Sequence, residues 1–161
     1  MRHSAQMDKG TGLFARDLFA SHLARLEKAA GERNRSLSIC VLTLAETPEV
    51  TRARSRGMLD KAVPQIGSMV ARLVRAEDTP GRLSNDVFAI ALPATSAIAA
   101  RNVGERISAV VSCTAFDSGQ GKPPYVVEFI VCAAEIQAGE PAAAALMRAA
   151  AAGGKPDREA V

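Results

Sequence analysis

Residues 75–88 read RAEDTPGRLSNDVF, and this stretch decides the fold. Pro80-Gly81 is expected to end the apolar-periodic helix before it, because proline lacks an amide donor and glycine weakens a helix. An extended run begins at 82–83 and a second one spans 86–92. Ser84-Asn85 is therefore predicted to be the two-residue loop of a β-hairpin.

Apolar residues at helical spacing predict two helices before the hairpin. The first runs from the region of Leu13 to about Ala30, where Gly31 ends it. The second carries its apolar stripe from 59 to 74, with Pro64 placed in or near its first turn, where a missing amide costs least. Between them, residues 37–44 are almost continuously apolar, which predicts a central strand covered on both faces.

After the hairpin, Thr95 or Ser96 is expected to cap a helix whose apolar positions include 99, 103, 107 and 110. Glycine and proline mark 115–124 as a loop. A mostly apolar strand is predicted over 126–134, and an alanine-rich helix is predicted between 140–141 and 153–156.

Composition restricts the class of protein. The chain has 161 residues, of which 48% are hydrophobic and 23% charged, as expected of one globular domain. It has no apolar run of about 20 residues and no apolar leader, which predicts a cytoplasmic location away from membranes. The three cysteines, Cys40, Cys113 and Cys132, are expected to be small buried hydrophobes. His3 and His22 lack the spacing of a zinc helix, so no metal site is predicted.

The formal charge of +3 favours anionic partners only weakly. The one basic cluster consists of Arg52, Arg54 and Arg56, and the chain has one tyrosine and no tryptophan for base stacking. These arginines are interpreted as a solvated basic face, and the composition argues against nucleic-acid binding.

Two motifs resemble the GGDEF family of bacterial signalling domains, whose active members make cyclic di-GMP from two GTP. The signature position reads SNDVF at 84–88, and 8–19, DKGTGLFARDLF, resembles the opening pattern of the family. The resemblance extends to about Leu146. It implies a degenerate GGDEF domain over 8–152, flanked by tails at 1–7 and 153–161. The implied fold is an α+β, nucleotide-cyclase palm-like domain with a central, mostly antiparallel sheet surrounded by helices.

The resemblance places neutral residues where active members bind magnesium. Thr43 stands at the position of a metal-binding aspartate, and Val87 replaces a glutamate. Ser84-Asn85 places side chains where two glycines let the nucleotide approach the backbone, whereas Asp86 remains as one carboxylate. Asp60 matches a guanine-contacting aspartate, and a helix N-cap is the alternative interpretation.

The resemblance also implies an inhibitory-type site that binds cyclic di-GMP through Arg-x-x-Asp. Arg75 and Asp78 lie five residues before the signature, in the register of that motif, and Arg106 is the candidate for a second arginine. A guanidinium suits phosphate oxygens or a guanine edge, and a carboxylate accepts from guanine N–H groups. The alternative is a structural ion pair or a turn-capping aspartate.

These observations lead to the hypothesis of a catalytically inactive GGDEF domain that acts as a cyclic di-GMP receptor without a cofactor. Relay to a protein partner, or to an attached receiver or sensor domain as in a two-component response regulator, is expected, and two copies bridged by ligand would form a homodimer. The alternatives are a scaffold that binds no nucleotide and a residual diguanylate cyclase that uses Asp86.

Overall fold

The computed structural model describes residues 7–153, so almost all of the tails predicted at 1–7 and 153–161 lies outside the described residues. The described chain forms one five-stranded sheet in the order β1-β3-β4-β2-β5. Only the β1–β3 pair is parallel, so the predicted mostly antiparallel α+β sheet is confirmed. The strands are β1 (Phe14–Ala15), β2 (Leu37–Leu44), β3 (Thr79–Ser84), β4 (Val87–Pro93) and β5 (Phe129–Glu135).

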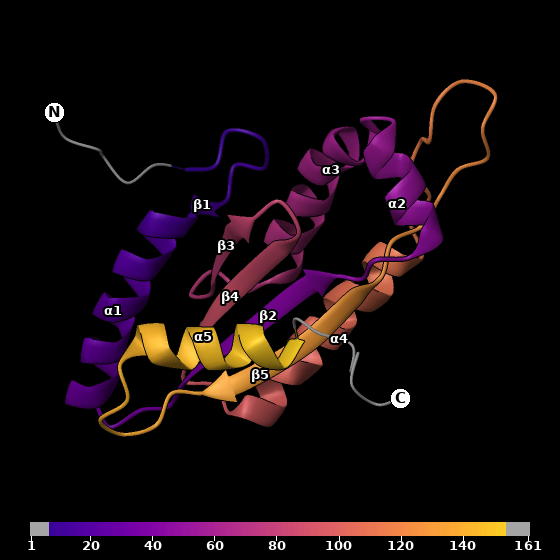
Figure 1. The fold of residues 1–161 in the computed structure, drawn as a ribbon. Helices are drawn as coiled ribbons and strands as arrows, with labels where there is room; N and C mark the ends of the chain where they lie inside the picture. The colour runs from indigo at the N-terminus through magenta and orange to yellow at the C-terminus, as the bar shows by residue number, and fades with distance from the viewer. Residues whose placement is uncertain (1–6, 154–161) are drawn as a thin grey trace, which may run out of the picture.

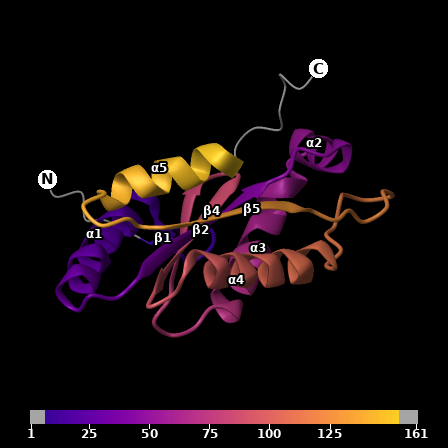
Figure 2. The same cartoon turned by 90° about the horizontal axis from the view of Figure 1, so that it is seen from below.

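Helices cover both faces of the sheet (Figures 1 and 2). Alternate residues of β2 and β4 point to opposite faces, as the pleat of a strand requires. Cys40, Leu42 and Phe88 pack in one core cluster with α2, α3 and α4, whereas Ile39 and Val41 pack in the other with α1 and α5. The helices are α1 (Arg16–Glu32), α2 (Pro48–Ser55), α3 (Met58–Leu73), α4 (Ala97–Ser112) and α5 (Ala142–Gly153).

The prediction that Pro80-Gly81 breaks a helix is wrong, because both residues lie inside β3. The preceding helix has already ended at Leu73, and Val74 is extended. Glycine is required at 81 for packing, since a Cβ there would lie 2.5 Å from Cδ2 of Phe19. Proline is tolerated at 80 because β3 pairs with β4 on one side and only with the short β1 on the other.

The hairpin exists, but its loop is shifted by one residue and consists of Asn85 and Asp86. The register changes between Arg82 and Ser84, so β3 contains one more residue than the pairing with β4 needs. This irregularity extends β3 through Ser84. Asn85 is not among the described residues with positive φ, so the left-handed turn that its side chain tolerates is not used.

Several helix ends differ from the prediction. Helix α1 continues through Gly31 to Glu32. Pro64 is the seventh residue of α3, not part of its first turn; Pro64 and Asp60 are both exposed, so water can bind the carbonyl that the proline leaves unpaired. The alternative role of Asp60 as N-cap is also wrong, since Gly57 occupies that position. Ser96, whose side chain accepts from the Ala99 amide, is confirmed as the cap of α4.

Helix α2 and strand β1 were not predicted, and β5 begins at Phe129 rather than at 126. Helix α2 does carry a start signal, because Thr47 accepts a hydrogen bond from the Val50 amide and Pro48 follows as the first helical residue. No helix within residues 7–153 combines the length and apolar character needed to cross a membrane.

The cysteines are not uniformly buried. Burial raises the pKa of Cys40 to about 12, which keeps it an unreactive thiol in the core. Cys132 is half-buried in β5, and Cys113 is exposed after the last turn of α4, contrary to the prediction that all three are buried.

The turn that opens the domain is fixed to β3 through one carboxylate. Oδ2 of Asp8 accepts from the Thr11 amide at 2.9 Å, from the Thr11 hydroxyl at 2.6 Å and from Nη1 of Arg82 at 3.3 Å. Partial burial pushes the pKa of Asp8 upward, but the hydrogen bonds from Thr11 and Arg82 outweigh it and hold this pKa below its ordinary value.

This arrangement predicts that Asp8→Asn destabilises the protein at neutral pH, by about 1–3 kcal/mol for the lost charge-assisted hydrogen bonds. A carboxyl whose folded pKa is depressed stabilises the fold above its unfolded pKa and loses that contribution as pH falls through the folded value. Urea unfolding at neutral pH and near pH 3 measures the effect. The difference between wild type and variant is expected to shrink at the lower pH, and an equal difference at both pH values would contradict this role.

Candidate functional site

The end of the hairpin brings together three of the predicted degenerate positions. Thr43 of β2 pairs directly with Val87 of β4. The backbone carbonyl of Asp86 accepts from the Leu44 amide at 2.8 Å. Ser84 and Asn85 are exposed beside them, whereas Asp60 is an exposed residue in the first turn of α3. The structure therefore brings 43, 86 and 87 together.

The Asp86 carboxylate is held by an arginine that the sequence did not single out for this role. Nη1 of Arg54 lies 3.0 Å from Oδ1 of Asp86, and Nη2 lies 2.9 Å from Oε2 of Glu46. The other oxygen of Glu46 accepts from the Thr51 hydroxyl at 3.0 Å. The Arg54 guanidinium is thus the cation that lies between the carboxylates of Asp86 and Glu46 at the loop end of the hairpin.

Each charged group in this bridge stabilises the charged form of its partner. The hydrogen bond to Asp86, with a smaller contribution from Glu46, raises the pKa of Arg54 further. The hydrogen bond from Arg54 lowers the pKa of Glu46. All three side chains are more than a third exposed, so the bridge orients groups more than it stabilises the fold. It also corrects the predicted basic face, because Arg54 turns away from Arg52 and Arg56 towards the hairpin.

The turn after α3 carries Arg75 and Asp78, the two residues predicted to bind ligand. Oδ2 of Asp78 accepts from the Arg75 amide at 3.0 Å, and the Asp78 amide donates to the Arg75 carbonyl at 3.1 Å. The Asp78 side chain is only 1% exposed. Its second oxygen, Oδ1, is buried and has no hydrogen-bond partner among the described residues. Asp78 therefore caps the turn through Oδ2, and its Oδ1 remains an acceptor without a partner among the described residues.

The guanidinium of Arg75 lies above this carboxylate and is 57% exposed. Nε is 3.5 Å from Oδ2 of Asp78 and 3.6 Å from Oε1 of Glu77. Nη2 donates to the Thr95 hydroxyl at 3.1 Å, and that hydroxyl donates to the Pro93 carbonyl. Arg75 therefore links the turn to the end of β4 and still presents a charged, solvent-facing surface.

Arg106 is not part of this group of contacts. It is an exposed residue in the third turn of α4, and within residues 7–153 it forms no ion pair or hydrogen bond with Arg75 or Asp78. The structure thus brings together two of the three predicted ligand-binding residues.

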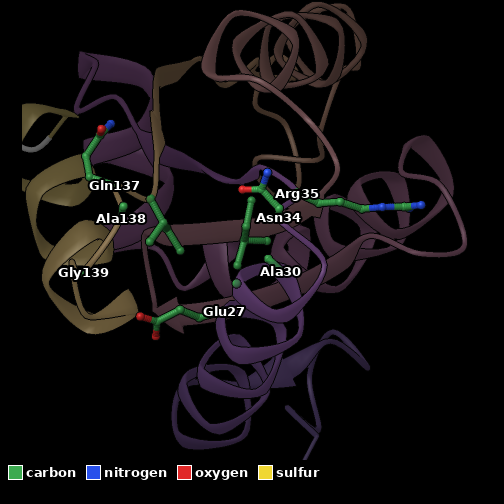
Figure 3. Close-up of a pocket in the computed structure, with 10 residues that line it drawn as sticks. Glu27, Ala30, Asn34, Arg35, Gln137, Ala138 and Gly139 are labelled. Atoms are coloured by element: carbon green, nitrogen blue, oxygen red, sulfur yellow. The ribbon is translucent and has the colours of Figure 1, made fainter.

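A separate pocket of about 240 Å³ lies between the end of α1 and the connection from β5 to α5 (Figure 3). None of the predicted site residues lines it. Arg35 extends away from the other labelled residues, and Oε2 of Glu27 accepts from the Ala142 amide at the start of α5. The polar groups of this pocket do not converge on a common point, so we assign no function to it.

Comparison with solved structures shows what the fold is similar to. The GGDEF domain of DgcB from Caulobacter crescentus, in complex with c-di-GMP, superposes with a TM-score of 0.81 at 22% identity, covering 94% of this chain and 87% of that chain. The FimX GGDEF domain from Pseudomonas aeruginosa gives 0.76 at 17% identity, covering 93% of each chain. Diguanylate cyclase SiaD from Pseudomonas aeruginosa, in complex with its activator SiaC, gives 0.80 at 24% identity, covering 92% of this chain and 56% of that chain.

No curated protein sequence matches this chain. The family model described as "Diguanylate cyclase, GGDEF domain" matches residues 5–153, which is nearly the whole sequence. With the sheet order, the hairpin between β3 and β4 and the similarity of fold, this match shows that the chain belongs to the GGDEF domain family.

Proposed function

We propose that this protein is a non-catalytic GGDEF domain that binds cyclic di-GMP at the turn formed by Arg75 and Asp78. One observation carries the proposal: a buried acceptor without a described partner, Oδ1 of Asp78, belongs to a carboxylate whose other oxygen lies 3.5 Å from the exposed guanidinium of Arg75. A buried acceptor left unpaired costs free energy, roughly 1–3 kcal/mol, which a ligand N–H group would recover. Guanine offers such N–H groups, and Arg75 is suited to the phosphate oxygens.

The similar DgcB domain, solved in complex with c-di-GMP, supports the choice of ligand. The Arg75 side chain can turn towards a ligand when it leaves Glu77. That contact is a long, exposed ion pair of 3.6 Å, which contributes little to stability and is readily broken.

The residues at the hairpin do not fit the magnesium ion that catalysis in this family requires. Magnesium prefers octahedral oxygen coordination, with carboxylates among its ligands. Thr43 and Val87 offer no carboxylate, and the two carboxylates at this end of the hairpin, Asp86 and Glu46, are already paired with Arg54.

This account predicts that the protein makes no cyclic di-GMP from GTP and Mg²⁺. The expected result is no product above background when concentrated protein is incubated with both and the mixture is separated by chromatography. Arg54→Gln is expected to be equally inactive, because freeing Asp86 and Glu46 still leaves neutral residues at 43 and 87. Product formed by the wild type and lost in Asp86→Asn would establish the residual cyclase instead.

Thermal unfolding distinguishes the receptor from a scaffold that binds no nucleotide. At a cyclic di-GMP concentration of about 100 times Kd, binding stabilises the native state by about 2.7 kcal/mol. For a domain of this size, this corresponds to an increase in Tm of roughly 5–11 °C. Unchanged Tm values with both cyclic di-GMP and GTP would favour the scaffold.

Output through another protein or an attached domain is the second part of the proposal. The similar SiaD is solved in complex with its activator SiaC, which shows that a protein with such a domain engages a protein partner. A receiver or sensor domain in the cytoplasm, and a ligand-bridged homodimer, are the arrangements that we propose here. Light scattering with and without cyclic di-GMP tests the dimer, which an unchanged mass would contradict.

A further inference from the structure

A second group of cations lies around a pocket that the proposed function does not use. Helix α2 and the loop before β5 enclose a volume of about 150 Å³, lined by Arg52, Arg56 and Lys122 together with Ser118 and Tyr125. Figure 1 shows this loop projecting beside α2, at the end of the molecule far from α1. The pocket is much larger than the roughly 10–15 Å³ that one water molecule requires.

The periodicity of α2 explains why these cations converge. Arg56 is the C-cap residue directly after α2, one turn beyond Arg52, and both line the pocket, whereas Arg54 lies near the opposite face of the helix and reaches the hairpin. Glu49 is the only acidic residue that lines the pocket, and it forms one exposed, 3.7 Å pair with Arg52. Within the part of the chain that the structure describes, Arg56 and Lys122 form no ion pair. Three cations and one carboxylate leave a net charge of +2 around the pocket.

The wall opposite α2 is held in place by its own contacts. The backbones of Phe116 and Tyr125 exchange hydrogen bonds of 2.7 and 2.9 Å, and the Tyr125 hydroxyl donates to the Met58 carbonyl at 3.3 Å. The Ser118 hydroxyl, which is buried, donates to the Pro123 carbonyl. Because these contacts hold both sides of the loop in place, the backbone that carries Lys122 has a defined position.

We propose that Arg52, Arg56 and Lys122 form a binding site for a phosphate-bearing small anion. The two arginines offer planar donor forks that match phosphate oxygens, and the lysine adds a compact charge. A group with two linked phosphates suits three cations better than a single carboxylate does. The proposal goes beyond the function assigned above, because Arg75 lies past the far end of α3, and a 16-residue helix spans about 24 Å.

Calorimetric titration with pyrophosphate tests the site on the full chain. The wild type is expected to bind it saturably at moderate ionic strength. The double variant Arg56→Gln/Lys122→Gln is expected to bind about tenfold more weakly or worse, as loss of charged hydrogen bonds predicts. The control is Lys28→Gln/Arg33→Gln, which removes the same charge from exposed positions on α1 and directly after it and should retain wild-type affinity.

Three outcomes would overturn the proposal. They are no saturable binding by the wild type in the millimolar range, equal weakening in both double variants, and equal affinity for sulfate and pyrophosphate. Arg75→Ala should bind pyrophosphate as the wild type does, and loss of binding there would show that the anion uses the other site. Circular dichroism verifies folding, and Lys122→Gln alone replaces the double variant if that variant unfolds. Cyclic di-GMP is also titrated into protein saturated with pyrophosphate. An unchanged affinity for cyclic di-GMP shows that the two ligands bind at separate sites.

Discussion

Arg75→Ala is expected to weaken cyclic di-GMP binding by about 10–100-fold while leaving the protein folded. The side chain offers charge-assisted hydrogen bonds, each of which contributes roughly 1.5–3 kcal/mol to binding. Its contacts within the protein are an exposed ion pair with Glu77, a 3.5 Å pair with the buried Asp78 carboxylate and one hydrogen bond to Thr95, so the free energy of unfolding should fall by about 1–3 kcal/mol. Calorimetry and urea unfolding of the same samples measure both quantities.

Arg72→Ala is the matched control for this prediction. Arg72 is an exposed arginine in the last turn of α3, and its one hydrogen bond among the described residues runs from Nε to the Ser68 carbonyl of its own helix. The control removes the same charge close to the site and should leave the affinity unchanged. Equal affinity in wild type, Arg72→Ala and Arg75→Ala would refute the assignment of the ligand to this turn.

Asp78→Ala is a less specific variant than Arg75→Ala. It deletes the acceptor for the ligand, but it also removes the cap of the Arg75 amide, at a cost of about 0.5–2 kcal/mol of stability. Its loss of binding would therefore combine two effects. Arg75→Ala separates them, since the Asp78 carboxylate and its hydrogen bond to the Arg75 backbone remain.

The second large expected effect concerns Phe88, the last residue of the signature pentapeptide. Its ring is 1% exposed and meets Phe129 edge to face, with ring centroids 5.8 Å apart. Phe88→Ala should therefore destabilise the protein by about 3–5 kcal/mol through lost burial and the cavity that remains. For a domain of this size, this lowers Tm by roughly 6–20 °C.

Phe88→Leu is the control, since it keeps an apolar side chain in the same place and should lose a smaller share of stability. Thermal and urea unfolding of the three proteins measure the series. A loss below about 1 kcal/mol in Phe88→Ala would contradict the assignment of this aromatic residue to the core. The position would then be explained by function instead.

The sequence patterns predicted the fold well where burial alone determines the structure. Strand β2 was predicted at its observed bounds because it lies between two strands and beneath helices on both faces, so every residue is apolar or small. Helix α3 was found from its apolar stripe. Strand β3 was misjudged, since the glycine at 81 is explained by the ring of Phe19, a contact between distant parts of the chain.

The candidate site was predicted only in part, because some of its contacts also join parts of the chain that are distant in sequence. Register in the sheet brought 43, 86 and 87 together, but β2 and β4 are apolar on both faces and show no alternation that would fix this register from the sequence. The Arg54 bridge to Asp86 depends on where α2 lies, and α2 was not predicted. Its Thr47 cap, followed by Pro48, was the signal that could have found it.

The most direct test of the receptor proposal is a calorimetric titration of the wild-type protein with cyclic di-GMP, followed in parallel by NMR of the labelled backbone. The account predicts saturable binding of micromolar affinity or tighter, with the largest shifts at the amides of Arg75 to Asp78. No heat at two temperatures, together with unshifted amides in that turn, would contradict it.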